Sequence, residues 1–435
     1  MTAAVDVRAL VRADRVHHRV YTDPAVYELE IKRLFERTWI YAGHESEIPE
    51  PGDYIRRTIG RRDIIVARTD TGGLAAFGNR CAHRGAAIIG VARGRVRNFE
   101  CPYHGWAYAR DGKLVGVPLA GGYPPDFDIE DRRWSLPAVA AVASYRGFIF
   151  VRIAGEGPPL ATYLGPVADA LDNMVDRAPG GRLIQAGGRF RQVYNGNWKL
   201  ILENSLDLLH PPYVHRSSYP TAAAWEAENP GKPVDQLVQQ IKANNISMHQ
   251  WDELGVFGLP FGHAYMGGFY QDSKIGTERT DAPYLAYKAA LVARHGRAKA
   301  EAVLALDRFN TVIYPNVVLN AHFLQLRFAH PVAVDRTVLE TYCFKMEGAP
   351  AAMHRASVRC LTALNSPSSM IAQDDHAVFA QTQRGVANVG ADGWVDFSRG
   401  TGAEGTDDGR RKGVGTSELP FRNQFQAWLG YLAAE

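Results

Sequence analysis

The 435-residue sequence predicts an α+β fold in two domains, an all-β domain followed by a larger domain built on an antiparallel sheet. Three observations predict this class. Short β-rich runs separated by Gly, Asp and Pro fill residues 41–155. Two longer β-rich runs, residues 313–331 and 336–346, predict neighbouring antiparallel strands. Helical patterns precede and follow them, at the end of residues 189–210 and over 369–385.

The elements can be justified in chain order. Residues 21–39 predict a helix, because Asp23 can cap it and Pro24 occupies its first position. The runs RDIIVART, GLAAFGNR and GFIFVRI then predict strands of the all-β domain. In the larger domain RFRQVYNGNWKLILENSLDLLH predicts a strand that runs into a helix.

Composition excludes several function classes. The net charge of +3 is too small to indicate a nucleic-acid or membrane-surface partner. No run of about 18 apolar residues predicts a membrane span. The chain has four cysteines, Cys81, Cys101, Cys343 and Cys360. So few cysteines argue against a secreted disulfide scaffold and predict a reducing, cytoplasmic compartment.

Two short loops of the all-β domain each pair one cysteine with one histidine. The first is Cys81-Ala-His83, followed by Arg-Gly, and the second is Cys101-Pro-Tyr-His104, followed by Gly-Trp. Structural zinc is the alternative, but zinc fingers usually group Cys with Cys and His with His. The mixed pairs predict a Rieske [2Fe–2S] centre, in which one iron takes two thiolates and the other two imidazoles. We expect the cysteines on a buried iron and the histidines on an exposed one.

The larger domain carries further candidate metal ligands in residues 197–215, NWKLILENSLDLLHPPYVH. Three polar residues of this run are spaced three apart and would share a helical face, Asn204, Asp207 and His210. Pro211 and Pro212 should interrupt the helix, because proline lacks an amide donor and disfavours helical geometry in the preceding residue. The interruption would allow His210 and His215 to converge on one ion.

A mononuclear Fe(II) centre of the 2-His-1-carboxylate type needs one further carboxylate. The helix predicted over residues 369–385 offers two, Asp374 and Asp375. Asp375 shares an apolar, inward-facing stripe with Ile371, whereas Asp374 lies about 100° around the helix. Asp375 is therefore the predicted ligand and Asp374 the alternative, and His376 is expected on the solvated face.

With these motifs the chain resembles the Rieske non-haem iron oxygenases, specifically the catalytic (α) subunits of aromatic ring-hydroxylating dioxygenases. The resemblance implies a helix-grip (START-like) catalytic domain, an antiparallel sheet curved around a long helix. It implies three segments: an N-terminal helical segment (1–40) that packs on the catalytic domain, a Rieske domain (41–155) and a non-haem iron catalytic domain (156–435).

Matching positions imply the functional residues. The cluster ligands would be Cys81, His83, Cys101 and His104, and the iron ligands His210, His215 and Asp375. Asp207, beside Asn204 in the catalytic site, would bridge to a Rieske histidine of a neighbouring subunit.

The resemblance implies a terminal oxygenase that uses O2 and external electrons to convert an aromatic ring to a cis-dihydrodiol. Residues 400–405 match G-x-G-x-x-G, but no strand precedes them and no helix follows, so no dinucleotide site is predicted. Electrons should therefore come from a separate reductase or ferredoxin. The expected assembly is a homotrimer, or a trimer with a small β subunit. A monooxygenase or O-demethylase on the same scaffold is the alternative, and a Rieske electron carrier fused to a ligand-binding module a more distant one.

One strand indicates the substrate. Alternation places Phe323, Gln325 and Arg327 on one face, and inward-facing polar side chains are costly unless they meet a polar partner. In related oxygenases that oxidise aromatic acids, an arginine at a similar place anchors a carboxylate. The resemblance therefore implies an aromatic carboxylate anchored by Arg327, in a pocket walled by Phe257 and Tyr265. The alternative is an Arg327 that faces outward or pairs with a structural acid.

Overall fold

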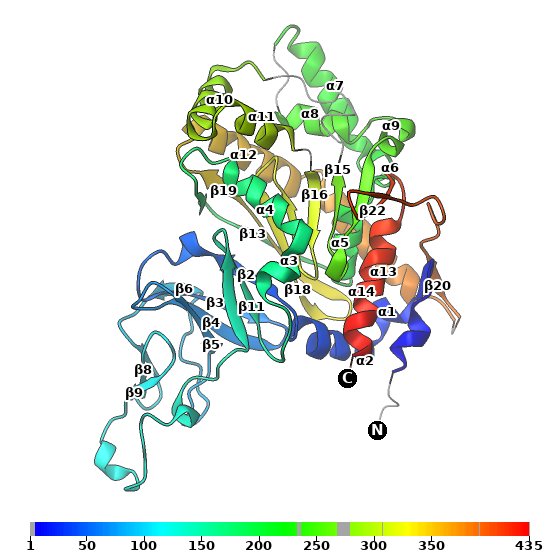
Figure 1. Ribbon diagram of the computed structural model, residues 1–435. Helices are drawn as coiled ribbons and strands as arrows, with labels where there is room; N and C mark the ends of the chain where they lie inside the picture. Colours follow the sequence, from blue (N-terminus) through cyan, green and yellow to red (C-terminus); the bar gives the residue numbers. More distant parts are fainter. Residues whose placement is uncertain (1–4, 233–235, 268–278, 307, 391, 435) are drawn as a thin grey trace. The chain divides into compact units, whose positions relative to one another are not determined.

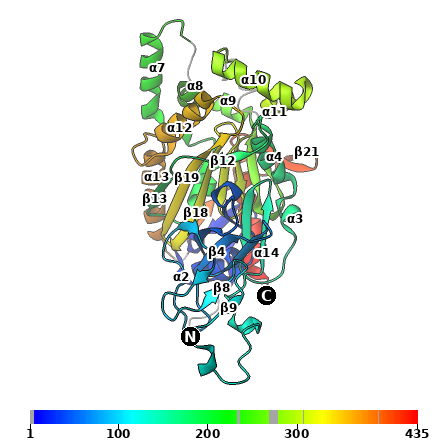
Figure 2. The ribbon, with the colours of Figure 1, turned by 90° about the vertical axis from the view of Figure 1, so that its left-hand side faces the viewer.

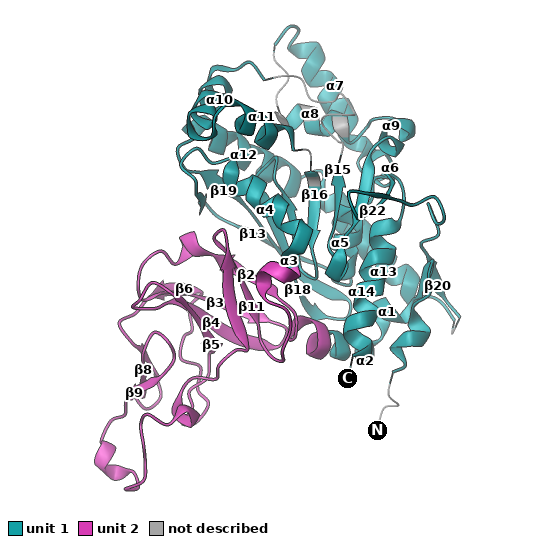
Figure 3. Ribbon diagram, viewed as in Figure 1, with its two compact units in different colours: residues 1–30, 164–435 teal, residues 31–163 magenta. Residues whose placement is uncertain are grey.

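The computed structural model (Figure 1) describes residues 5–232, 236–267, 279–306, 308–390 and 392–434. It divides the chain into two compact units (Figure 3). Unit 2 comprises residues 31–163, and unit 1 combines residues 1–30 with 164–435. The N-terminal segment thus belongs to the same unit as the C-terminal two thirds of the chain.

Unit 2 is built from short antiparallel sheets. Their orders are β10-β11-β2, β5-β4-β3-β6 and β7-β8-β9. The strands are β2 (Ile40–His44), β3 (Asp53–Ile59), β4 (Arg62–Arg68), β5 (Leu74–Gly78), β6 (Arg93–Arg95), β7 (Phe99–Glu100), β8 (Ala107–Tyr108), β9 (Leu114–Gly116), β10 (Ala141–Tyr145) and β11 (Phe148–Arg152). Aromatic side chains such as Phe77, Phe99 and Trp106 fill the core beside Cys81 and Cys101. The predicted all-β domain is present.

Unit 1 is organised by one large antiparallel sheet. Over the described residues it has ten strands in the order β12-β19-β18-β17-β16-β15-β14-β22-β21, with β13 also paired to β19. The strands are β12 (Leu183–Gln185), β13 (Phe190–Tyr194), β14 (Gly255–Gly258), β15 (Ala264–Gly267), β16 (Arg308–Ile313), β17 (Val317–Asn320), β18 (Gln325–Ala333), β19 (Arg336–Met346), β21 (Gly405–Asp407) and β22 (Arg410–Val414). A separate small ribbon pairs β1 (Arg15–His17) with β20 (Trp394–Asp396).

Helices cover this sheet. In Figure 2, α12 and α13 lie on one side of the sheet and α4 lies on the other. The helices are α1 (Arg19–Thr22), α2 (Pro24–Leu29), α4 (Ala168–Asp176), α5 (Lys199–Ser205), α6 (Pro211–Val214), α7 (Tyr219–Glu228), α8 (Gln236–Ala243), α9 (Met248–Asp252), α10 (Ala282–His295), α11 (Arg297–Ala305), α12 (Ala351–Asn365), α13 (Ala372–Ala387) and α14 (Leu419–Ala433), while α3 (Leu160–Leu164) spans the boundary of the units. Within the described residues, none of the helices combines the length and apolarity that crossing a bilayer requires.

The N-terminal helix begins as predicted and ends earlier. The Asp23 side chain accepts a hydrogen bond from the Ala25 amide, and Pro24 is the first residue of α2. A π-helical turn over Glu30–Phe35 follows α2, so the helical segment does not reach Trp39.

The helix predicted to run from Asn204 through His210 is wrong, because α5 ends at Ser205. The Asp207 carboxylate accepts hydrogen bonds from the amides of Leu209 and His210, at 2.6 and 3.3 Å. This side chain competes with the helical hydrogen bonds, as Asp does at turns. Pro211 then starts α6 instead of ending a helix.

A fully buried carboxylate ties three segments of unit 1 together. Glu30 is 0% exposed. Its Oε1 accepts from Lys199 Nζ at 2.6 Å and Trp428 Nε1 at 2.7 Å, and its Oε2 accepts from Trp198 Nε1 at 2.9 Å. Burial lowers the pKa of Lys199, an effect that the Glu30 charge opposes. The N-terminal segment, α5 and α14 therefore share one charge-compensated centre.

Glu30→Gln should destabilise unit 1, because it leaves the Lys199 ammonium buried without its counter-ion. Breaking a buried pair from one side costs about 3–5 kcal/mol. Denaturant unfolding of the intact chain measures the loss. The matched control is Glu226→Gln, which removes an exposed pair with Lys242 and should cost at most about 1 kcal/mol. Equal stability of the two variants would contradict this role for Glu30.

Candidate metal centres and active-site cavity

The two Cys/His loops of unit 2 fold in the same way. In each, the cysteine amide donates to the carbonyl of the residue five positions later, at 2.8 Å. The amides of Gly85 and Gly105 donate back to the carbonyls of Cys81 and Cys101, at 3.0 Å in both loops. Each glycine has a positive φ, +77° and +69°, which side chains disfavour. The two turns place Cys81 and Cys101 in one core cluster and bring the imidazole rings of His83 and His104 into contact.

The four side chains are arranged as a Rieske cluster needs. Cys81 and Cys101 are buried, at 1% and 2% exposure, whereas His83 and His104 are partly exposed. The two imidazole rings lie 4.7 Å apart between centroids. The Nδ1 atom of His83 is buried and has no hydrogen-bond partner among the described residues. This donor set, with two buried thiolates and an unpaired imidazole nitrogen, fits a [2Fe–2S] cluster.

Aromatic side chains enclose this group. The Trp106 ring stacks on His83 at 4.9 Å with an angle of 5° between planes. The Tyr108 hydroxyl lies 3.1 Å from Cys81 Sγ and accepts a hydrogen bond from the Ala82 amide at 3.1 Å. Burial raises the pKa of Tyr108, so the phenol keeps its proton and can donate it toward the sulfur.

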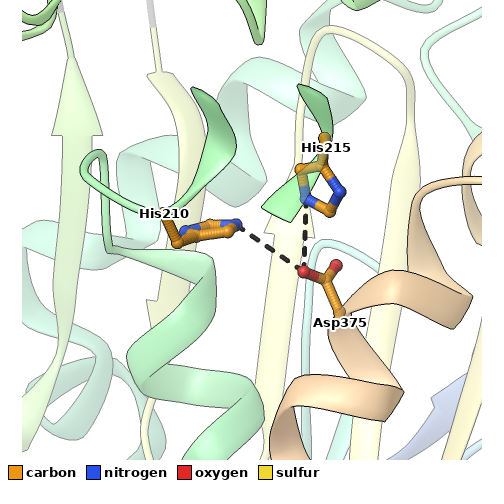
Figure 4. Close-up of side chains that lie close together, drawn as sticks. All are labelled: His210, His215 and Asp375. Carbon is orange, nitrogen blue, oxygen red and sulfur yellow. Dashed lines mark ion pairs between the residues drawn. The ribbon is translucent and has the colours of Figure 1, made fainter. Parts of the chain in front are cut away.

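Unit 1 brings together His210, His215 and Asp375 (Figure 4). Asp375 Oδ1 lies 3.2 Å from His215 Nε2 and 3.7 Å from His210 Nε2. One ligand atom from each residue lies within 4.8 Å of the others. The histidines flank the single turn of α6, and Asp375 lies in the first turn of α13. Two imidazoles and one carboxylate form the triad that binds non-haem Fe(II), so these residues fit that ion.

Neighbouring groups orient the triad. His210 Nδ1 lies 2.9 Å from the Asp207 carbonyl, which accepts its proton and leaves Nε2 free to bind a metal. Asn204 Nδ2 donates to Asp375 Oδ1 at 3.0 Å. Asp374 lies on the other side of His215, with its Oδ2 3.7 Å from Nδ1. The geometry therefore favours Asp375 as the metal ligand and places Asp374 where it can orient His215.

Burial and mutual contacts shift the pKa values of the three triad residues. Burial lowers the pKa of His210 and keeps its imidazole neutral. Burial alone would raise the pKa of Asp375, but the hydrogen bond with His215 holds it below its usual value. Burial alone would lower the pKa of His215, but the hydrogen bond with Asp375 and the charge of Asp375 raise it above its usual value. A metal ion binds the deprotonated forms of these groups, so any proton held between His215 and Asp375 should be released when a metal ion binds.

His376 is not part of the triad. The sequence placed it on a solvated face, but its side chain is only partly exposed. Its ring packs against Tyr194 of β13 and Phe379, with centroids 5.4 and 6.0 Å away. The solvated placement is wrong because β13 covers this face of α13.

The triad lines a cavity with an empty volume of about 670 Å³, part of which is open to solvent. Apolar side chains form part of the wall, Leu208, Trp251, Met266, Phe323, Leu364 and Ile371. Gln325 and Arg327 of β18 also line it, as strand alternation predicted. Arg327 Nη2 donates to Asn310 Oδ1 at 3.2 Å. Asn310 has no sequence pattern that would have marked it as a cavity residue.

Phe257 and Tyr265 do not line this cavity. They form a cross-strand pair of β14 and β15 and stack on each other at 4.4 Å. The next residue of β15, Met266, lines the cavity, so alternation directs Tyr265 and Phe257 to the opposite face. There Tyr265 contacts the Arg308 guanidinium at 3.9 Å. Phe257 and Tyr265 therefore do not form the predicted aromatic wall of this cavity.

Comparisons with known proteins match both parts of the chain. Residues 38–142 match the Rieske [2Fe-2S] domain model, and residues 182–433 match the ring hydroxylating alpha subunit (catalytic domain). The toluate 1,2-dioxygenase subunit alpha of Pseudomonas putida is 34% identical over 403 residues, which cover 92% of this chain and 84% of that protein. The anthranilate 1,2-dioxygenase large subunit of Acinetobacter baylyi is 33% identical over 398 residues, with coverage of 91% and 82%.

A solved structure agrees on the fold. Naphthalene 1,2-dioxygenase with bound indole superposes with a TM-score of 0.82 at 23% identity, covering 100% of this chain and 95% of that one. This likeness confirms the expected fold, a Rieske domain joined to an antiparallel-sheet catalytic domain. The chain therefore belongs to the ring-hydroxylating oxygenases, as a catalytic α subunit with its own Rieske [2Fe–2S] domain.

Proposed function

We propose that this enzyme cis-dihydroxylates the ring of an aromatic carboxylate that Arg327 binds. The observation that carries the substrate class is the position of Arg327 in the same cavity as the metal triad. The relatives that are similar over most of the chain are named for toluate and anthranilate, both aromatic carboxylates, which supports the proposal.

Arg327 is a partly buried cation that forms no salt bridge with the described residues, although the charge of Asp375 acts on it. Burial lowers its pKa to about 10, so the guanidinium remains charged near neutral pH. Within the described ranges, no carboxylate lies within ion-pair distance of it, and its hydrogen bond goes to the neutral Asn310. An enclosed charge is costly unless it is paired. A substrate carboxylate would pair its two oxygens with two N–H groups on one edge of the guanidinium.

The remaining walls suit an aromatic ring. Phe323 and Ile371 are apolar, and both line the cavity with Asp375 and Arg327. We infer that the carboxylate lies at Arg327 and the ring against the apolar wall, directed toward the triad. Anchoring the charged group fixes the ring and lowers the entropic cost of a productive orientation.

We infer that His210, His215 and Asp375 hold the mononuclear iron. When bound, the iron would supply the centre at which dioxygen is activated. The protein's own contribution is orientation: the Asp207 carbonyl fixes the tautomer of His210, and Asn204 holds the Asp375 carboxylate. Asp374 faces the outer nitrogen of His215.

Electrons would enter through a cluster held by Cys81, His83, Cys101 and His104. We propose a cytoplasmic reductase or ferredoxin as the donor. Both described hydrogen bonds to the Asp207 carboxylate use Oδ1, which leaves Oδ2 for a donor from outside. We infer that this donor is a Rieske histidine of a neighbouring subunit in a trimer, with or without a small β subunit.

Arg327→Leu tests the function directly. Losing a charge-assisted pair costs roughly 2–3 kcal/mol, so KM for benzoate should rise by about a hundredfold. The assay measures cis-dihydrodiol formation with a surrogate reductase. The control is Arg297→Leu, which removes an exposed arginine outside the cavity wall and should leave KM unchanged. An unchanged KM in Arg327→Leu, or a wild-type preference for uncharged arenes, would contradict the proposal.

Two adjacent substitutions separate the candidate iron ligands. Asp375→Ala should lose the mononuclear iron and all turnover while the visible spectrum of the cluster stays. Asp374→Ala should retain the iron with an affinity lower by about 10- to 100-fold, as expected for a residue that only orients a ligand. Iron content per chain, measured during chelator titration, reports both. Retention of iron in Asp375→Ala and loss in Asp374→Ala would reverse the assignment.

Tyr108→Phe should lower the reduction potential of the cluster. A hydrogen bond to a ligand sulfur stabilises the more negative reduced state, so removing it favours the oxidised form. A neutral hydrogen bond is worth ~1 kcal/mol, which corresponds to roughly 40 mV for one electron. Potentiometric titration of the reduced cluster's EPR signal measures the shift. A potential equal to that of the wild type would show that the phenol does not donate to Cys81.

A further inference from the structure

Gln325 is a buried polar side chain at the wall of the cavity. The residue begins β18, and its side chain is on the same face of the strand as Arg327, two residues later. It is 4% exposed and lines the cavity. Its Nε2 is buried without a hydrogen-bond partner among the described residues. A buried amide donor left unpaired is costly, so a group in the cavity is expected to accept its hydrogen bond.

The neighbouring amides do not fill this role. Besides Gln325, several carboxamide residues line the cavity, Asn204, Gln240, Asn244, Asn310, Asn320 and Asn365. Asn320 lies opposite Gln325 in the β17–β18 ladder, but its Oδ1 already accepts from the Phe323 amide at 3.0 Å. Asn310 accepts from Arg327 and donates to the Ser205 carbonyl at 2.9 Å. Gln325 is therefore a cavity-lining residue whose amide nitrogen has no partner among the described residues.

The substrate carboxylate does not need Gln325. The guanidinium of Arg327 has the planar fork that pairs with both oxygens of one carboxylate. A second polar group on the same ring would then meet Gln325. A hydroxyl group suits this position because it both accepts and donates, so it pairs with the amide in either of its two orientations.

We propose that Gln325 is a specificity-determining residue that binds a phenolic hydroxyl, and that the preferred substrate is a hydroxylated aromatic carboxylate. This inference rests on the proposed function, because Arg327 must place the ring. A methyl group has nearly the size of a hydroxyl but offers no hydrogen bond. A site built to bind a hydroxyl therefore discriminates against the methyl analogue.

The test compares the wild-type enzyme on position-matched pairs of acids. The ortho, meta and para hydroxybenzoates are each compared with the methylbenzoate substituted at the same position, and kcat/KM is measured for all six. At one position the hydroxy acid should be preferred by about tenfold or more. Gln325→Leu should bring that ratio close to one. The control Gln426→Leu changes an exposed glutamine of α14 and should keep the wild-type ratio.

Thermal unfolding supplies a second readout. Because no described residue accepts a hydrogen bond from Gln325 Nε2, Gln325→Leu should leave the melting temperature unchanged or raise it. A clear fall in melting temperature with an unchanged substrate ratio would show a structural role and overturn the inference. Equal kcat/KM for every hydroxy and methyl pair in the wild type would overturn it while leaving the proposed function standing. Preference for uncharged arenes over every acid would overturn both.

Discussion

The active site depends on how Asp207 ends helix α5. Its carboxylate accepts hydrogen bonds from the amides of Leu209 and His210, and its carbonyl accepts a hydrogen bond from Nδ1 of His210. The first interaction stops the helix before the histidines, and the second fixes which imidazole nitrogen faces the cavity. Without this turn, a continuous helix would direct His210 and His215 about 140° apart, at about 100° per residue. One residue thus sets both the path of the backbone and the tautomer of a metal ligand.

Much of the site could be predicted from the sequence because its chemistry lies in short local runs. The cysteine and histidine pairs specify their own turns, and each ends in a glycine with positive φ. Asp375 could be favoured over Asp374 because helical periodicity placed it with Ile371, and the two do line one cavity. Neither prediction depends on the position of another segment of the chain.

The wrong predictions required information that sequence does not carry locally. Phe257 and Tyr265 were assigned to the cavity by their aromatic character, but which face of β14 and β15 turns inward depends on strand pairing across the sheet. The break of α5 at Ser205 was missed because Asp207 acts through its side chain rather than through helix propensity. The carboxamides of the cavity come from separate helices and strands, so only the folded chain brings them together.

Glu30 and Gln325 show how buried polar groups divide between stability and function. Glu30 is as buried as any residue, yet Trp198, Lys199 of α5 and Trp428 of α14 donate hydrogen bonds to its carboxylate. Gln325 is almost as buried, and no residue of the described chain satisfies its amide nitrogen. Hydrogen bonds within the protein offset the desolvation cost of Glu30, whereas a hydrogen bond to a ligand would have to offset that of Gln325. Buried polar atoms that the fold leaves unpaired at a cavity wall therefore carry the information about what the cavity binds.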